Sequence, residues 1–333
     1  MSFDVPSWTL AAVVPERAVA GIRDEAREDR AWSRHGDLHL RTLDAADAGL
    51  RLVSVRVPDA LALDAPSLAD ACARAYALLA TELDGERSLE PVRLWNFIPR
   101  ILEPLGDQPH RYMVFNAGRY RALRSQLGAA FDRRIATASG VGHQGRDLSI
   151  HCLAAARGGE PVENPRQIPA YRYSARWGPK PPCFARATRC ELEAPLLLVG
   201  GTASVVGEES LHQGDLEAQL HETLRNLATV VHVGVLNGHR QVDAPLPGDD
   251  ELWPQLARFR NLRVYHPRRG DRECLRRALL EQLGDTVELE LLEADLCRPE
   301  LLVEIEGVAE LAPRVRRLVA WLDPRRRRAV RLG

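Results

Sequence analysis

The segment ADLCRPELLVEIEG, residues 294–307, combines a strand-like apolar run with two carboxylates and a cysteine. Successive side chains of a strand point to opposite faces, so Glu304 and Glu306 share one face and the apolar residues share the other. Either the glutamates face solvent, or they line a cleft that another part of the chain closes. In a cleft, loss of water would raise the pKa of such a carboxyl and let it serve as a general acid near neutral pH.

A second group of chemically capable residues lies in the proline-rich segment 157–190. Its arginines stand among tyrosine, tryptophan and phenylalanine residues; they are Arg172, Arg176, Arg186 and Arg189. The planar guanidinium suits carboxylates, because it can donate two parallel hydrogen bonds to one carboxylate group. The segment is therefore either a pocket for an anionic ring compound or an ordinary surface loop.

Tyr112 and Arg119 are the third group, in the helical stretch RYMVFNAGRYRAL. They are seven residues apart, which is two helical turns, and therefore share a face. The spacing fits a binding face, but it also fits an amphipathic helix whose arginines extend along its apolar side.

Other motifs are weaker. GVGHQG, residues 140–145, has the letters of a dinucleotide-binding turn, but a strand-like stretch follows where a helix is required, so we interpret it as a glycine-rich turn. HETLR, residues 221–225, lacks the second histidine of a zinc helix. Cys183 and Cys190 have no histidine nearby, so we expect no metal site.

Strand-like and helix-like stretches follow one another twice in the same order, which predicts two copies of one α+β unit, each a sheet backed by two helices. In the first copy the strands are 50–58, 91–100 and 146–156, and the helices 67–83 and 111–131. In the second copy the strands are 195–206, 261–267, 286–295 and 301–311, and the helices 215–234 and 271–284. We expect units at 1–156 and 191–333, joined by a substrate-binding segment at 157–190.

Bulk properties exclude several classes of protein. The 333 residues carry a formal net charge of −1, so no overall field attracts nucleic acid or an anionic membrane, and the basic tail 324–331 is interpreted as solvated. The N-terminus MSFDVPSWTL has no basic segment followed by an apolar one, and no apolar run is long enough to span a bilayer. We therefore expect a cytoplasmic protein.

Five segments together resemble the chorismatases, which remove pyruvate from chorismate. They are VRLWNFIPR (92–100), RYMVFNAGRYRAL (111–123), ENPRQIPAYRYSARWGPKPPCFARA (163–187), LLLVGGTASVVGEES (196–210) and ADLCRPELLVEIEG (294–307). The resemblance extends over about residues 45–312, and the C-terminal half is also similar to the RidA/YjgF family. It implies an α+β fold of two RidA/YjgF-like units in one chain, each a mixed sheet backed by helices.

The resemblance also implies roles for particular residues. Glu304 matches the catalytic acid, and Cys297 matches a position that is cysteine in the subgroup that makes 3-hydroxybenzoate. The residues that match or border the substrate site are Tyr112, Arg119, Tyr171, Arg186, Ala203 and Ser204, and the alignment at Tyr171 leaves Tyr173 open as the alternative.

The implied function is cleavage of chorismate to pyruvate and 3-hydroxybenzoate, alone or with 4-hydroxybenzoate, by protonation of the enolpyruvyl methylene. The alternatives are a hydrolytic chorismatase that releases a dihydroxycyclohexadiene carboxylate, a RidA-like imine deaminase and a non-catalytic small-molecule binding protein. The resemblance implies no cofactor and no metal, a monomer, and chorismate as the small-molecule partner.

Overall fold

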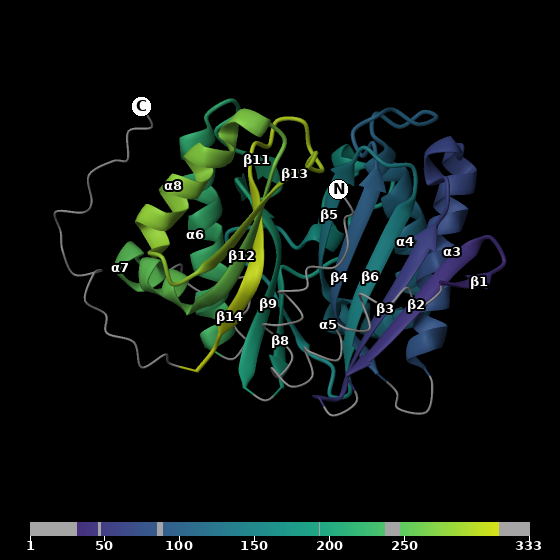
Figure 1. The fold of residues 1–333 in the computed structure, drawn as a ribbon, viewed down its shortest axis with the longest axis horizontal. Coiled ribbons are helices and arrows are strands. Elements are labelled where there is room, and N and C mark those ends of the chain that lie inside the picture. The colour runs from purple at the N-terminus through teal and green to yellow at the C-terminus, as the bar shows by residue number, and fades with distance from the viewer. Residues whose placement is uncertain (1–31, 46–47, 85–88, 193, 237–246, 313–333) are drawn as a thin grey trace.

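Two six-stranded mixed sheets face each other in the middle of the molecule, and helices cover their outer faces (Figure 1). The structure is a computed structural model, and it describes residues 32–45, 48–84, 89–192, 194–236 and 247–312. The expected α+β class, with two mixed sheets backed by helices, is confirmed.

The first unit is built on a sheet of strand order β1-β2-β3-β6-β4-β5. Its strands are β1 (Ser33–His35), β2 (Leu38–Ala45), β3 (Leu50–Val57), β4 (Glu90–Pro99), β5 (Thr137–His143) and β6 (Leu148–Ala155). Its helices are α3 (Ala65–Leu83), α4 (Arg111–Leu127) and the short α5 (Phe131–Arg134).

The second unit is built on a sheet of order β13-β12-β14-β9-β8-β7. Its strands are β7 (Glu160–Val162), β8 (Ala187–Glu191), β9 (Pro195–Ala203), β12 (Phe259–His266), β13 (Glu288–Glu293) and β14 (Glu304–Glu310). A small separate ribbon pairs β10 (Val205–Val206) with β11 (Glu209–Ser210). The helices are α6 (Leu216–Val235), α7 (Asp249–Leu252) and α8 (Arg272–Leu283).

The two units repeat one topology. In the first, the antiparallel pair β2–β3 is followed by α3, β4, α4, β5 and β6, and β6 inserts between β3 and β4. In the second, β8–β9 is followed by α6, β12, α8, β13 and β14, and β14 inserts between β9 and β12. In each unit, the strand that comes last in the sequence therefore lies in the middle of the sheet. In the second unit this strand carries Glu304.

Three apolar layers hold the molecule together. One packs helices α3 and α4 against the first sheet, and another packs helices α6 and α8 against the second sheet. The third lies between the two sheets, where Trp95 and Leu153 of the first unit belong to the same cluster as Leu198 and Tyr265 of the second. Because large side chains are fully desolvated in this layer, the inter-sheet contact resembles a protein core.

Some local expectations are wrong. The proposed turn at 140–145 begins as a strand, because β5 extends through His143, and β2 and β8 were not expected as strands. The glycines of β5 reflect close packing: a Cβ on Gly140 would lie 3.3 Å from the Tyr112 ring, and one on Gly142 would lie 2.8 Å from Asp295 Cβ. The strand expected at 301–311 begins at Glu304.

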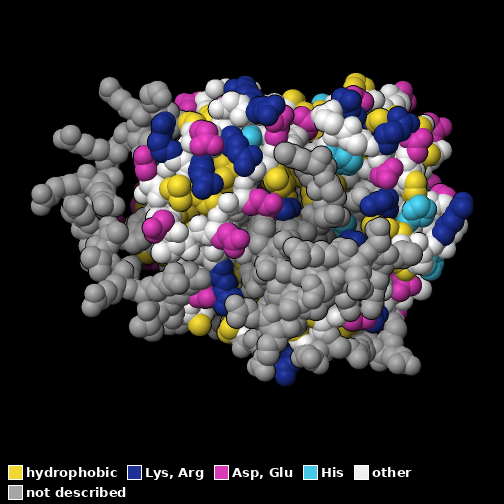
Figure 2. Space-filling model, viewed as in Figure 1, with side chains coloured by type: hydrophobic (Ala, Val, Ile, Leu, Met, Phe, Trp, Pro, Cys, Tyr) yellow, Lys and Arg dark blue, Asp and Glu magenta, His cyan; other side chains and the backbone are white. Residues whose placement is uncertain are grey.

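The unit limits 1–156, 157–190 and 191–333 remain a prediction, and the basic tail 324–331 lies outside the described residues. On the face that Figure 2 presents, basic and acidic side chains are interspersed. In the part of the chain that the structure describes, no helix is long and apolar enough to cross a membrane.

Helices α3 and α4 approach closely at Gly118. A Cβ added at Gly118 would overlap the carbonyl oxygen of Ala69 and lie 2.8 Å from Cys72 Cβ. Because the Ala69 carbonyl belongs to the backbone of α3, the two helices would have to separate to accommodate a side chain at position 118.

We therefore predict that Gly118→Ala lowers the free energy of unfolding by about 1–3 kcal/mol, the usual range for overpacking. The loss should appear although alanine favours a helix interior over glycine by about 1 kcal/mol. Urea denaturation measures the effect, and Gly270→Ala is the control, because a Cβ there meets nothing within 4 Å. Equal stability of the two variants would contradict the tight helix contact.

Candidate active site

A cavity of about 390 Å³ lies between the two units. Its wall combines α4 and β5 of the first unit with β9 and the segment before β14 of the second. The irregular stretch between β7 and β8 completes the wall with Tyr173 and Trp177. The charged residues of the wall are Arg119, Arg176, Arg186, Arg298, Glu300 and Glu304.

Glu304 is the first residue of β14 and lies on the cavity wall, with 5% of its surface exposed. Burial, together with the nearby charge of Glu306, raises its pKa from the usual 4.5 to about 8, against the opposing influence of Arg93, Arg186 and Arg298. The carboxyl therefore holds its proton at neutral pH, which is the state a general acid requires. The strand pattern left solvent and a closed cleft open for the two glutamates; both are buried, and Glu304 lines the cavity.

Gly201 makes room for the Glu304 carboxyl. A Cβ at this position would overlap Oε1 of Glu304 and lie 2.8 Å from its Cδ. Between the pairs Ile305–Thr202 and Gly307–Val199 the register shifts, so that Glu306 alone lies opposite both Gly200 and Gly201. Such a bulge bends a strand and redirects side chains, and it is common beside active sites.

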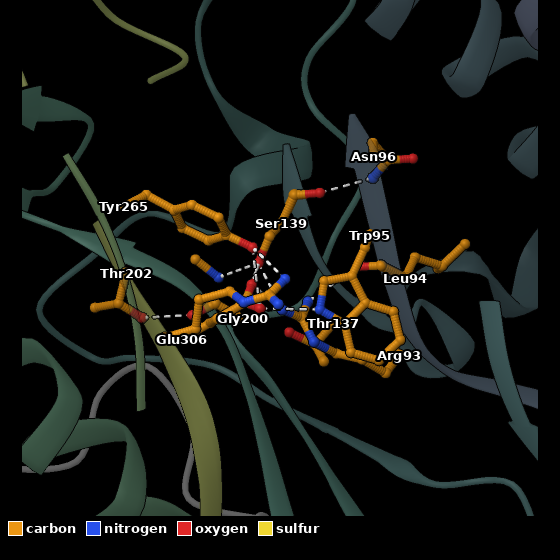
Figure 3. A network of polar contacts seen from close by, with 12 residues as sticks. Arg93, Leu94, Trp95, Asn96, Thr137, Ser139, Gly200, Thr202, Tyr265 and Glu306 are labelled. Carbon is orange, nitrogen blue, oxygen red and sulfur yellow. Dashed lines mark hydrogen bonds and ion pairs between the residues drawn. The ribbon is translucent and has the colours of Figure 1, made fainter. Parts of the chain in front are cut away.

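Glu306 lies two residues further along the same face and is held by donors from both units (Figure 3). It accepts hydrogen bonds from Arg93 Nη2 at 2.6 Å, Trp95 Nε1 at 3.0 Å and Tyr265 Oη at 3.2 Å. The hydroxyl of Ser139 donates a further, short hydrogen bond to it. Arginine and indole N–H groups can only donate, so the Glu306 carboxyl is an ionised acceptor.

Helix α4 supplies Tyr112 and Arg119, and both line the cavity as their shared helical face predicts. Arg119 is 1% exposed and donates through Nη2 to the carbonyl of Cys183. Its guanidinium lies 5.8 Å from the centre of the Phe184 ring. Burial raises the pKa of the Tyr112 hydroxyl, so this group remains a neutral hydrogen-bonding group.

Arg186 is the most buried arginine of the proline-rich segment. It is 7% exposed and donates through Nη2 to the carbonyl of Ile168 at 2.9 Å and to the hydroxyl of Tyr173 at 2.7 Å. Each arginine carries five N–H donors, so most donors of Arg186 are not used by the described hydrogen bonds. Of the other arginines in the segment, Arg176 lines the cavity, and Arg172 pairs with Asp132 outside it.

Tyr171 and Ser204 are the two expected site residues that do not line the cavity. The Tyr171 ring packs edge-on against Phe131 at a centroid distance of 5.8 Å, in the core of the first unit. The hydroxyl of Ser204 donates to the carbonyl of Leu211. Tyr173, the open alternative to Tyr171, lines the cavity beside Arg186.

Cys297 lines the cavity near Glu304, and so does Ala203. Burial, with a smaller contribution from the Glu304 carboxyl, raises the pKa of the Cys297 thiol to about 12. The thiol is therefore neutral at physiological pH and is not a nucleophile of the thiolate type.

Arg298 was not expected in the site, although it directly follows Cys297 in a segment that carries the resemblance. Its guanidinium lies 3.4 Å from the centre of the Trp177 ring, and Nη1 donates to Glu208 O and Ser210 Oγ, each at 2.9 Å. It thus adds a third buried cation to the cavity wall beside those from α4 and the proline-rich segment.

The structure thus brings together six of the eight expected residues. They are Tyr112, Arg119, Arg186, Ala203, Cys297 and Glu304. Among the described residues, no three histidine, cysteine or acidic side chains gather as metal ligands would.

The chain is similar to several known proteins in its sequence and in its fold. Residues 26–154 match the family described as "Chorismatase FkbO/Hyg5-like, N-terminal". The chain is 36% identical to a 3-hydroxybenzoate synthase of Streptomyces hygroscopicus over 222 aligned residues. This alignment covers 65% of this chain and 62% of that protein. It is 35% identical over 223 residues to a chorismatase of Streptomyces rapamycinicus, with 65% and 63% covered.

The match thus spans somewhat less than two thirds of the length of these curated relatives. A crystal structure of a chorismatase is similar with a TM-score of 0.69 and 29% identity, over 84% of this chain and 78% of that one. The fold and site define a duplicated α+β protein with a buried acid in an arginine-lined cavity. In sequence and in fold, the chain is similar to the chorismatases.

The raised pKa of Glu304 predicts a pH-dependent stability. The folded protein binds the Glu304 proton more tightly than the unfolded chain does, so this stabilisation is complete below about pH 4.5 and is lost as pH rises to about 8. Glu304→Gln, which is neutral throughout, should therefore gain free energy of unfolding relative to wild type across this window, by at most about 1.4 kcal/mol per pH unit.

Urea denaturation at several pH values measures this difference, with Glu288→Gln on the exposed edge of β13 as the matched control. A difference between wild type and Glu304→Gln that stays constant with pH would contradict a protonated Glu304.

Proposed function

We propose that this protein cleaves chorismate to pyruvate and 3-hydroxybenzoate, with Glu304 as the proton donor. The observation that carries the proposal is a carboxyl with a raised pKa, buried on the wall of a cavity that also presents several arginines. The relative named 3-hydroxybenzoate synthase supports the choice of product, and so does the presence of Cys297 on the wall.

Chorismate carries two carboxylates, a ring diene, a hydroxyl group and an enolpyruvyl ether. The arginines match the two carboxylates, because guanidinium groups with unused donors can bind them in pairs of charge-assisted hydrogen bonds. Arg119 and Arg186 lie on the cavity wall and use only Nη2 in their described hydrogen bonds, so each retains donors for a substrate. We assign the tyrosine beside Arg186 to Tyr173, because Tyr171 lies in the core.

Cleavage begins with transfer of the Glu304 proton to the methylene carbon of the enol ether, which produces an oxocarbenium ion. Carbon is a poor base, so the acid must be positioned close to it in a site that excludes bulk water. The carboxylate that remains on Glu304 then stabilises the adjacent cation electrostatically.

The oxocarbenium ion can react in two ways. Attack by the ring hydroxyl, loss of pyruvate and rearomatisation give hydroxybenzoate with no net uptake of water. Capture of the cation by water gives pyruvate and the dihydroxycyclohexadiene carboxylate, which is the second candidate product. A neutral thiol at Cys297 fits the first outcome, since it occupies space near Glu304 without activating a water molecule.

Incubation of the purified protein with chorismate, followed by HPLC of the products, tests the proposal. Wild type should release pyruvate and 3-hydroxybenzoate in equal amounts, and Glu304→Gln should lose at least about 100-fold in kcat, the low end of the effect of a general acid. Binding of chorismate, measured by calorimetry, should persist in this variant. Full turnover by Glu304→Gln would eliminate Glu304 as the acid, and absence of turnover by wild type would eliminate the function.

The space provided by Gly201 gives a second prediction. Gly201→Ala should displace the Glu304 carboxyl and lower kcat with chorismate by about 100-fold, because a misplacement of about 1 Å is enough for such a loss. Stability should change less than activity, since the flexible Glu304 side chain can move away. Steady-state kinetics with Gly270→Ala as control measures the effect, and an unchanged kcat would show that the carboxyl position is not critical.

A further inference from the structure

We propose that Glu306 is a positioning residue for Glu304: its charged carboxylate, held by both units, fixes Ser139 and Gly201 against the Glu304 carboxyl and keeps a negative charge beside it. This inference rests on the proposed function, because it concerns how the proton donor of that reaction is held. It assigns a role to four contacts that the reaction itself does not use.

The position of Glu306 is determined by donors from three strands besides its own. Arg93 and Trp95 come from β4 and Ser139 from β5 of the first unit, whereas Tyr265 comes from β12 of the second (Figure 3). Glu306 is 2% exposed and Arg93 is 2% exposed, so the ion pair is fully desolvated. A buried carboxylate with four donors has little freedom to move, and it connects the two sheets through hydrogen bonds from β4, β5 and β12.

Ser139 connects Glu306 to the backbone beside the Glu304 carboxyl. Its hydroxyl donates to Glu306 and accepts from Arg93 Nη2 at 2.5 Å and from the backbone N–H of Gly201 at 2.9 Å. One donated and two accepted hydrogen bonds use the full capacity of a serine hydroxyl. The orientation of this hydroxyl therefore depends on Glu306, and the backbone of Gly201, on which the Glu304 carboxyl rests, depends on the hydroxyl.

The two carboxylates occupy opposite environments although they lie on one face of β14. Glu306 takes the strong donors and remains charged, whereas Glu304 lies among groups that leave it protonated. Pairs of carboxyls with such divergent environments commonly divide the acid and charge-bearing roles of a site. A fixed negative charge nearby makes loss of the Glu304 proton less favourable.

Some of the groups that face Glu304 raise its pKa and others lower it. Arg186, which directly precedes β8, and Arg298, from the segment before β14, favour its charged form, and so does Arg93 of β4. Glu306 opposes them, and burial opposes them most strongly. Removing Glu306 would leave Arg93 without its counter-charge, so both changes act to lower the pKa of Glu304.

Infrared titration of the Glu304 carboxyl, taken as the difference between each protein and its Glu304→Gln counterpart, tests the proposal without relying on turnover. In Glu306→Gln the titration midpoint should fall by at least about one pH unit relative to wild type. With chorismate, the alkaline limb of kcat/KM should move down by the same amount, so that kcat/KM at high pH falls about tenfold or more. Glu288→Gln should leave both midpoints in place.

Ser139→Ala is the second variant, because loss of one partner of a buried ion pair can unfold a protein and this variant leaves the ion pair intact. It should remain folded by circular dichroism, keep KM within about threefold and lose at least about tenfold in kcat. A merely structural role for the network would lower stability and leave kcat of the folded protein unchanged.

The outcomes separate this proposal from the function on which it rests. An unchanged infrared midpoint in Glu306→Gln, or wild-type kcat in Ser139→Ala, would overturn the positioning role while chorismate cleavage stands. If wild type does not act on chorismate, the proposed function fails, and the infrared midpoints still decide whether Glu306 controls Glu304.

Discussion

The burial of two carboxyl groups on one face of a central strand is the constraint on which the rest of the structure depends. A buried carboxyl must either be neutral or be surrounded by donors, because an isolated charge in a protein interior is very unfavourable. Glu304 meets the condition by holding a proton, and Glu306 meets it through four donors from both units. The packing of one sheet on the other supplies the dry environment of the first and the partners of the second.

Duplication of the unit allows the two halves to take different roles around one cavity. The first unit supplies a helix face with Tyr112 and Arg119 and an edge strand with Ser139. The second supplies the acid and the glycine-rich bulge of β9 that makes space for it. Glycines at this bulge and in β5 bring the backbones of the two sheets close enough for one hydroxyl, that of Ser139, to contact both.

The parts of this arrangement that lie on regular strands and helices could be predicted from the sequence, because their side chains repeat with a fixed period. Strand alternation identified the shared face of Glu304 and Glu306, and helical spacing identified Tyr112 with Arg119. Strand β5 was missed because its glycines resemble a turn, whereas the close approach of Tyr112, Ile101 and Asp295 explains them.

Other features have no local signal at all. The choice between Tyr171 and Tyr173 lies in an irregular segment, where no period determines which side chain turns inward. The partners of Glu306 come from positions 93, 95, 139 and 265, which only the assembled pair of sheets brings together. Arg298 could have been found as a neighbour of Cys297, but nothing in its spacing distinguishes it from a surface arginine.

The cavity wall takes residues from both units of a single polypeptide, and this has a consequence for how the site assembles. A site shared between separate subunits falls apart on dilution, because its completeness depends on an association constant. In this chain one polypeptide supplies both walls, so the described cavity needs no association of separate subunits to bring these walls together.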